Sequence, residues 1–241
     1  MKRVSVGFIA FTVSVITPLA HADTLSAGFG VGLWKTSPSG TLNNINIKQD
    51  AGLGTENNSY AWAYINHPLP FVPNVRIERI DQSYSGTGTV SSFLDTSFNG
   101  NETHTRMTLD QTDALLYWGF SLPLIRFDYG LGAKQVSGDV TITDINSNSS
   151  HQSLNETLPI GYLSGQLSLP SLPITLSADT KTLRSRFNDT TFKARYDITT
   201  FGLKLGAEAG YRTQIINSND INNLNIDMKI DGYFAGITLV F

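Results

Sequence analysis

The last eleven residues of the chain, 231–241, read DGYFAGITLVF. Apolar side chains stand at every second position up to the terminal Phe241, and successive side chains of a β-strand point to opposite faces. Tyr233, Ile237 and Phe241 therefore share one face of a predicted strand, whereas Val240 belongs to the other face. The stretch predicts a final β-strand with one face that is apolar along its whole length.

The first residues have the pattern of a removable secretory signal. A charged start at Lys2 and Arg3 precedes an apolar stretch at residues 4–16, and an Ala-His-Ala cleavage site follows. We expect residues 1–22 to be a signal peptide and residues 23–241 to form one outer-membrane β-barrel domain. A membrane-spanning helix is the competing interpretation, but it would need about 20 apolar residues.

Alternation at period two runs through the rest of the chain in segments of about ten residues. In residues 24–35, glycines fill one face and apolar residues the other. In residues 124–134 and 203–214, the face opposite the apolar one also carries charges. Strands are expected over residues 24–35, 59–67, 74–85, 111–121, 124–138, 156–168, 172–185, 191–200, 203–217 and 226–241.

The connections between these strands are short and long in turn. The short ones contain proline and the long ones are polar. The short connections are 68–73, 122–123 and 170–173, and the long ones are 37–59, 86–110, 138–155 and 217–225. A β-sandwich also alternates polar and apolar residues, but short periplasmic turns and long extracellular loops are typical of bacterial barrels. The sequence therefore predicts an all-β fold, a closed antiparallel transmembrane β-barrel of about ten strands.

The composition disfavours several classes of function. The chain has no cysteine, so neither a disulfide framework nor a cysteine-based zinc site is expected. Loss of Lys2 and Arg3 with the signal peptide leaves 15 basic against 20 acidic residues, which disfavours nucleic acid as a partner. The glycines of residues 24–35 are not followed by the helix that a nucleotide loop requires. We expect a monomer without a cofactor.

Five short motifs are spread over the chain: HPLP at 67–70, PNVR at 73–76, DQTDALLYW at 110–118, GYR at 210–212 and DGYFAG at 231–236. In these motifs the chain resembles a family of small Gram-negative outer-membrane β-barrel proteins with no assigned activity, although the family usually carries glycine where Asp231 stands. The likeness covers nearly the whole chain. It implies a barrel in the cell outer membrane, in contact with outer-membrane lipid and lipopolysaccharide, and it implies no catalytic residues.

The terminal strand also resembles the signal by which outer-membrane barrels are recognised by their assembly machinery. The residues that carry this likeness are Gly236, Leu239 and the terminal Phe241. The resemblance implies that the barrel assembly machinery is a partner of the chain.

One face of the expected strands carries many charges. Buried charges must be paired and hydrogen-bonded, and a barrel of about ten strands is largely filled by side chains. We expect a salt-bridged network that plugs the lumen; the alternative is a narrow polar conduit or a binding cleft. The expected network comprises Arg76, Glu78, Asp113, Arg126, Asp128, Asp179, Lys181, Lys193, Arg195, Asp197, Lys204, Glu208 and Arg212.

Catalysis would need a tighter constellation of side chains at the outer rim. A protease-like set would combine carboxylates with a histidine, and a lipid-modifying set would combine His, Ser and a carboxylate. The candidates are His104 with Asp110 and Asp113, and His151 with Ser153 and Glu156. In polar loops such groupings are more often incidental, so no catalytic or metal-binding residue is expected. The sequence favours a structural role, or passage or binding of a small solute, with a rim-active membrane enzyme as the alternative.

Arg79 breaks the pattern of its strand. Counted from Val75 and Ile77, its side chain would face lipid. Either a β-bulge shifts the register there or the expected strand at residues 74–85 is misplaced.

Aromatic residues are expected mostly near strand ends or at outward positions, where barrels carry interfacial girdles. A platform for carbohydrate binding is the alternative. These residues are Trp34, Tyr60, Trp62, Tyr64, Trp118, Phe120, Tyr129, Tyr196, Tyr211 and Tyr233.

Overall fold

The structure is a computed structural model that describes residues 25–69, 71–98, 100–169, 171–200, 202–221 and 224–241. The expected signal peptide, residues 1–22, lies outside these residues. Within the described ranges there is no helix that could cross a membrane.

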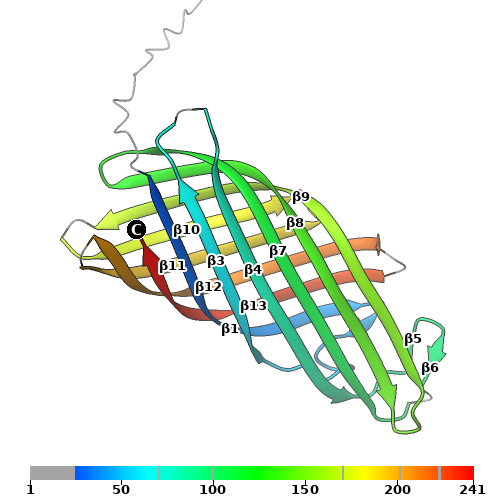
Figure 1. Cartoon of the computed structure of the whole chain (residues 1–241). Coiled ribbons are helices and arrows are strands. Elements are labelled where there is room, and N and C mark those ends of the chain that lie inside the picture. The colour runs from blue at the N-terminus through cyan, green and yellow to red at the C-terminus, as the bar shows by residue number, and fades with distance from the viewer. Residues whose placement is uncertain (1–24, 70, 99, 170, 201, 222–223) are drawn as a thin grey trace, which may run out of the picture.

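Ten strands of the described chain form one closed antiparallel barrel (Figure 1). Each strand pairs with its neighbour in chain order, and the last pairs with the first. The strands are β1 (Ser26–Leu42), β3 (Glu56–Asn66), β4 (Asn74–Gly88), β7 (Thr103–Ser121), β8 (Ile125–Asp144), β9 (Ser149–Leu169), β10 (Ile174–Leu183), β11 (Phe187–Thr200), β12 (Leu203–Ile221) and β13 (Leu224–Val240). The two-residue strands β2 (Ile45–Asn46), β5 (Ser92–Phe93) and β6 (Thr96–Ser97) lie in the connections after β1 and β4. The predicted fold class and strand number are confirmed.

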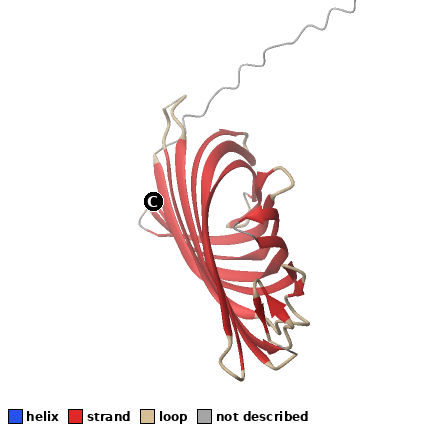
Figure 2. Cartoon of the chain, turned by 90° about the vertical axis from the view of Figure 1, so that its right-hand side faces the viewer, coloured by secondary structure: helices blue, strands red, loops and turns tan. Residues whose placement is uncertain are grey.

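The barrel closes between β1 and β13, and Figure 2 shows the strands curving round into one wall. Gly28 stands opposite Val240 at the start of this pairing. Just beyond β13, the backbone N–H of Phe241 donates to the carbonyl of Ala27 at 2.9 Å, and the N–H of Ala27 donates back at 2.8 Å. The last residue of the chain thus completes the seam.

The glycines of β1 face the lumen, and large aromatic rings lie against them. A Cβ atom on Gly30 would lie 2.5 Å from the ring of Trp62, and one on Gly32 would lie 2.6 Å from the ring of Tyr60. Trp62 and Tyr60 belong to the neighbouring strand β3 and stand directly opposite these glycines. The small face of β1 therefore lets the two rings lean across it into the lumen.

An apolar belt surrounds the barrel on the side of the chain termini. Every barrel strand contributes exposed apolar side chains to it, and Leu131, for example, is 68% exposed. One such residue from each strand, in chain order, is Val31, Ile65, Ile77, Leu116, Leu131, Leu163, Leu176, Phe192, Leu205 and Ile237. Soluble proteins rarely expose a contiguous apolar patch of this extent, whereas a transmembrane barrel carries an outward apolar band about 25 Å tall. The belt makes this fold a transmembrane barrel.

Most strands continue well beyond the belt, on the side away from the termini. β7 already begins at Thr103 and β9 at Ser149. Residues 103–110 and 149–155 were expected to lie in long loops, and that expectation is wrong. These segments keep the period-two alternation but place polar residues outward, so they pair as strands above the membrane-facing surface.

Arg79 faces outward without a β-bulge, because β4 pairs with both neighbours in unbroken register. Its guanidinium contacts Asp81 Oδ1 at 2.6 Å and Asp110 Oδ2 at 3.1 Å on the outer surface. The expected bulge or misplaced strand is therefore wrong. The apolar belt on β4 ends at Ile77, and Arg79 stands where the outward surface becomes polar.

β10 and β11 are shorter than their neighbours β9 and β12, so the barrel wall is shorter there (Figure 1). β10 pairs with β9 only from Gly161 onward, so residues 149–160 of β9 pair with β8 alone among the described residues. On the other side, β11 pairs with β12 only up to Ile216. The strand pairing of the described residues therefore has a gap between the upper part of β9 and the upper part of β12. We call this gap the notch.

An apolar core fills the lumen of the extended half. The connection after β1 contributes Ile45 and Ile47 to it, and the connection after β4 contributes Val90, Phe93 and Phe98, all buried. Both connections were expected to be long polar loops. Their apolar residues instead fold inward and fill the mouth of the barrel.

Candidate functional site

Six charged side chains meet in the lumen and form what we call the central ion cluster. Each comes from a different strand, which brings β4, β7, β8, β10, β11 and β12 together. The bases are Lys134, Lys181 and Arg212, and the acids are Glu78, Asp113 and Asp189. None of these side chains is more than 7% exposed. Three positive charges thus balance three negative ones where water has almost no access.

Short contacts connect the members of the cluster. Lys181 Nζ lies 2.9 Å from Glu78 Oε1 and 2.7 Å from Asp113 Oδ2. Arg212 lies 2.6 Å from Glu78 Oε1 and 2.5 Å from Asp189 Oδ2. Desolvated charges are tolerated only when partners of this quality surround them.

Glutamine side chains extend the cluster across the lumen. Lys134 Nζ lies 2.5 Å from Asp113 Oδ1 and donates to Gln111 Oε1 at 3.0 Å. The Gln111 amide donates to Gln82 at 2.8 Å and to Gln214 at 2.9 Å. The ions and amides together occlude the lumen at this level.

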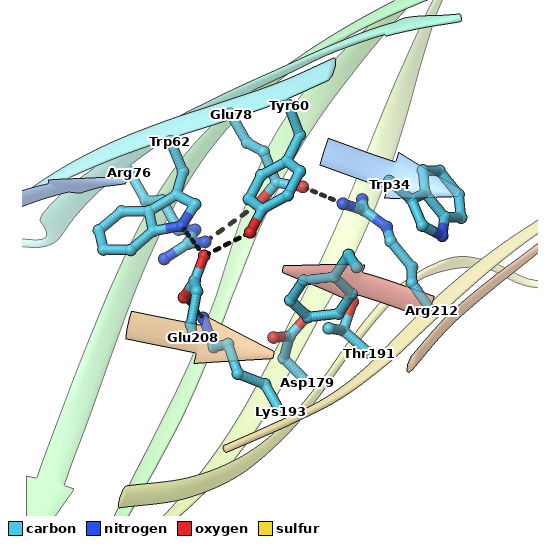
Figure 3. A pocket seen from close by; sticks show the side chains of 11 residues that line it. Trp34, Tyr60, Trp62, Arg76, Glu78, Asp179, Thr191, Lys193, Glu208 and Arg212 are labelled. Carbon is cyan, nitrogen blue, oxygen red and sulfur yellow. Dashed lines mark hydrogen bonds and ion pairs between the residues drawn. The ribbon is translucent and has the colours of Figure 1, made fainter. Parts of the chain in front are cut away.

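A small chamber lies beside the cluster, around Glu208 (Figure 3). Glu208 Oε1 accepts hydrogen bonds from Tyr60 Oη at 2.9 Å and from Trp62 Nε1 at 2.8 Å, and Oε2 lies 3.1 Å from Lys193 Nζ. The free space is about 20 Å³, which holds little more than one water molecule. Glu208 is therefore a buried, ion-paired carboxylate that has no room for a substrate beside it.

A larger polar chamber, the vestibule, lies at the strand ends near the termini. Its free space is about 110 Å³. Three arginines at its wall each contact the acid two residues further along the same strand. The pairs are Arg76–Glu78 at 3.1 Å, Arg126–Asp128 at 2.8 Å and Arg195–Asp197 at 3.0 Å. Trp62, Tyr64, Tyr117 and Tyr162 complete the wall. The vestibule thus combines charged hydrogen-bond donors with aromatic surface.

Asp179 separates the vestibule from the small chamber and lines both. Within the described part of the chain, its carboxylate makes no hydrogen bond or ion pair. Arg76 and Lys193 line the same two spaces. A half-buried carboxylate without a partner is costly, so Asp179 offers its oxygens to water or to a solute in the vestibule.

The structure places the expected network residues as follows. All of them except Asp179 and Lys204 take part in ion pairs, and Lys204 is exposed near the start of β12. The sequence reasoning missed Lys134 and Asp189. Lys134 is the last residue of the alternating segment 124–134 and lies on its inward face, so alternation alone could have identified it. Asp189 lies two residues before the expected start of its strand, although the alternation of that strand, continued backward, puts it on the inward face.

The three residues of the terminal pattern lie on or directly after β13. Leu239 belongs to the outward face, and Phe241 is 56% exposed on the same face. Gly236 faces the lumen beneath the Tyr60 hydroxyl, where a Cβ atom would collide with it. The assembly role of this pattern stays a prediction.

The two candidate catalytic groupings do not converge. Asp113 is buried in the central ion cluster, whereas Asp110 is on the outer surface with Arg79. On β9, His151 faces outward and lies 3.5 Å from Asp139, while Glu156 is on the inward face. Among the described residues, no three His, Cys, Asp or Glu side chains gather as metal ligands.

The expected aromatic girdle is wrong for β1 and β3. Trp34 is 1% exposed, Trp62 4% and Tyr60 8%, and all three fill the lumen. Trp34 lies on the same face of β1 as the glycines, and Tyr60 and Trp62 stand opposite those glycines on β3. Alternation therefore assigns all three rings to the inward face. At outward positions, Tyr233 is 75% exposed and Tyr129 53%, as a girdle requires.

No protein-family model matches the chain, and no curated protein matches its sequence significantly. Among solved structures, it is similar to Ail, the attachment invasion locus protein of Yersinia pestis, solved in complex with the heparin analogue sucrose octasulfate (8% identity, TM-score 0.41, 91% of this chain and 100% of that one). It is also similar to neisserial surface protein A (11% identity, TM-score 0.33, 89% and 95%). The barrel assignment rests on the strand pairing of the chain itself.

Proposed function

We propose that the chain is an integral outer-membrane protein without a catalytic role. In this proposal it binds a small polar solute in the vestibule and keeps its lumen closed to steady passage. The observation that carries the proposal is the occlusion of the lumen by the central ion cluster, next to an open vestibule of about 110 Å³.

The apolar belt and the placement of the ends support an outer-membrane location. The strand ends at the belt are joined by short turns, and the opposite ends extend far beyond it. In bacterial outer-membrane barrels the short turns are periplasmic and the long extensions face outward. The vestibule therefore opens toward the periplasm, and the apolar core closes the outer side.

The vestibule has the chemistry of a site for a small solute with an acidic group. The guanidinium groups of Arg76, Arg126 and Arg195 can donate to a carboxylate or phosphate. Asp179 can accept from an ammonium or hydroxyl group of the same solute. The rings of the wall can cover its apolar part. A free space of this size suits a solute of only a few non-hydrogen atoms.

Planar-bilayer recording tests the closed lumen. The purified barrel is expected to show no steady conductance, because a dry, balanced ion cluster leaves no continuous water path. A large and stable conductance from the unmutated protein would refute the closed lumen and favour passage.

Single cysteines test the vestibule, because the chain has none of its own. Ser177→Cys places a thiol at the vestibule wall, and Gln214→Cys places one in the occluded layer, where the native residue is 0% exposed. A small anionic thiol reagent is expected to modify the first far faster than the second. Acetate and glycine, used as test solutes, are expected to slow the modification of Ser177→Cys. Equal rates for both variants, or no protection by either solute, would contradict solute binding.

A further inference from the structure

A second cavity lies in the extended half of the barrel, opposite to the vestibule. Its free space is about 40 Å³, and its walls are almost entirely apolar. Leu42, Leu154 and Ile226 line it from three different strands. Water finds few hydrogen-bond partners against such walls, so an apolar group can occupy this space without displacing tightly held water.

The two methionines that follow Met1 both line this cavity. Met107 reaches it from β7 and Met228 from β13, and the chain has three methionines in all. Methionine is unbranched and polarizable, and it adapts its shape to irregular apolar partners. Two such side chains can widen a cavity of this size around a flexible hydrocarbon. We call it the methionine cavity.

The notch and the methionine cavity have Leu154 of β9 in common. Leu154 lies on residues 149–160 of β9, the part that has no partner on the β10 side among the described residues. Across the notch, Met228 stands opposite Ile216, the last residue of β12 that β11 covers. Within the described chain, the short hairpin of β10 and β11 therefore leaves β9 without a partner on that side at Leu154, a residue that lines the cavity.

Two exposed arginines lie at the turn of this short hairpin. Arg184 and Arg186 lie in the turn between β10 and β11, and both are exposed. Along β10 the outward residues change from apolar to threonine after Ala178. For a strand tilted by 35–45°, the turn then stands roughly 12 Å above the apolar belt. Long arginine side chains can reach back from there to the lipid headgroups.

The distance between the arginines and the cavity suits one hydrocarbon chain. The register of β9 and β10 ends with Thr182 opposite Gly161, and two more residues in the same register would bring Arg184 level with Pro159. Leu154 is five residues from Pro159, toward the start of β9. Five residues of strand span about 17 Å, a length that a fatty acyl chain can cover. The small size of the cavity admits the end of one such chain and excludes a second.

We propose that the notch binds a single-chain anionic amphiphile, a fatty acid or a single-chain phospholipid, taken laterally from the outer leaflet. Arg184 and Arg186 hold the acidic headgroup, and the end of the chain occupies the methionine cavity. This site is separate from the vestibule and does not depend on the function proposed for it.

A photoreactive fatty acid with its reactive group at the chain end tests the proposal. The full-length barrel is reconstituted in vesicles of neutral phospholipid that contain this probe, and the adducts are mapped by mass spectrometry. Lipid in the bilayer can label only outward residues such as Leu131. Adducts on the inward residues Met107, Leu154 or Met228 are expected, and they require that the chain enters the lumen. Adducts confined to outward residues would overturn the proposal.

Charge variants separate the headgroup contact from non-specific attraction. Arg184→Glu with Arg186→Glu should lower the inward adducts by roughly tenfold. The matched control, Lys48→Glu with Arg106→Glu, makes the same charge change at exposed positions outside the notch and should leave them unchanged. A fatty alcohol of the same chain length should label weakly and should not respond to the arginine changes. Equal effects of both charge variants would show that Arg184 and Arg186 are not a specific site for the headgroup.

A cavity-filling variant tests the position of the chain end. Leu154→Trp fills the methionine cavity and should abolish the inward adducts on Met107 and Met228 while labelling of Leu131 continues. Persistent inward adducts in a folded Leu154→Trp barrel would contradict the assignment. The charge variants lie in exposed turns or on exposed positions, so they remain informative if this variant fails to fold.

Discussion

Arg212 of β12 and Glu78 of β4 join two separated parts of the barrel wall, with Nη1 only 2.6 Å from Oε1. β13, β1 and β3 lie between the two strands in the sheet order, so the contact crosses the lumen. Glu78 also receives Lys181 of β10 at 2.9 Å. One carboxylate therefore connects three regions of the wall, and the loss of a partner leaves buried charge without compensation.

Arg212→Met should lower the free energy of unfolding by about 3–5 kcal/mol, because Glu78 and Asp189 both lose a buried partner. Denaturant titration of the barrel in lipid vesicles measures the change. A second change, Asp189→Asn in the Arg212→Met background, should recover part of the loss, because it removes one of the uncompensated charges.

Arg79→Met is the matched control for this prediction. Arg79 also contacts two acids, but its side chain is 48% exposed and stands on the outer surface. Ion pairs in such positions contribute about 0–1 kcal/mol. If Arg79→Met and Arg212→Met lowered the free energy of unfolding equally, burial would not explain how much the central ion cluster contributes to stability.

The lipid-facing side of β12 offers a second test. Ala207 is exposed to the apolar belt, and its neighbours across the sheet, Tyr196 and Ile237, are exposed too. Ala207→Arg should therefore cost about 2–4 kcal/mol in a bilayer unfolding titration, the range for a charge near the midplane. A neutral effect would mean that the register of β12 is wrong.

The neighbouring position provides the comparison for Ala207→Arg. Glu208→Gln should cost less, because an amide oxygen can still accept from Tyr60 and Trp62. Only the contact with Lys193 is lost, and that side chain is 13% exposed toward the vestibule. If Glu208→Gln cost more than Ala207→Arg, the inward ion pairs would be more important than the lipid face.

The sequence predicted the barrel because alternation at period two is a local property of each strand. It did not predict where the strands end above the belt, because this depends on pairing with other strands. β9, for example, continues to Ser149 because it pairs with β8 up to that residue. For the same reason, the notch could not be foreseen. The apolar core was missed because Ile47 and Phe93 occur in segments that look polar overall.

The candidate site was predicted in part. Parity alone placed most of the charged network in the lumen, because every second residue must face inward. Parity cannot choose partners, which depend on strand order and height: Lys181 meets Asp113 across strands far apart in sequence. The inward rings of Trp34 and Trp62 were assigned to girdles, because composition says where aromatics are common but not which face they take.

Deletion of Phe241 should lower the folded yield in the outer membrane far more than Val240→Thr. The deletion removes two backbone hydrogen bonds to Ala27 at the seam and an outward apolar side chain. Val240→Thr alters only an inward position. Heat-modifiable migration of membrane fractions measures the yield. Similar yields for the two variants would show that the terminal residue is not needed for assembly.

The turn between β8 and β9 should respond to acid through Asp144. Burial acts to raise the pKa of Asp144, but hydrogen bonds from Asn148 and Asn101 and from the backbone of Asn146 outweigh it, so the pKa lies below its ordinary value. A lowered folded pKa means that the ionised carboxylate stabilises the turn above the unfolded value of about 3.9. That contribution is lost as the pH falls through the folded pKa.

Amide NMR signals of Asn146 and Asn148 in micelles should report this loss, because both backbone N–H groups donate to Asp144 Oδ1, at 2.9 and 2.8 Å. The signals should shift only below about pH 4, and Asp144→Asn should remove the shift. Asp139→Asn, on the outer face of the same strand, should leave the curve in place. A midpoint above pH 4, or an identical titration in the Asp144→Asn variant, would mean that these hydrogen bonds do not hold the turn.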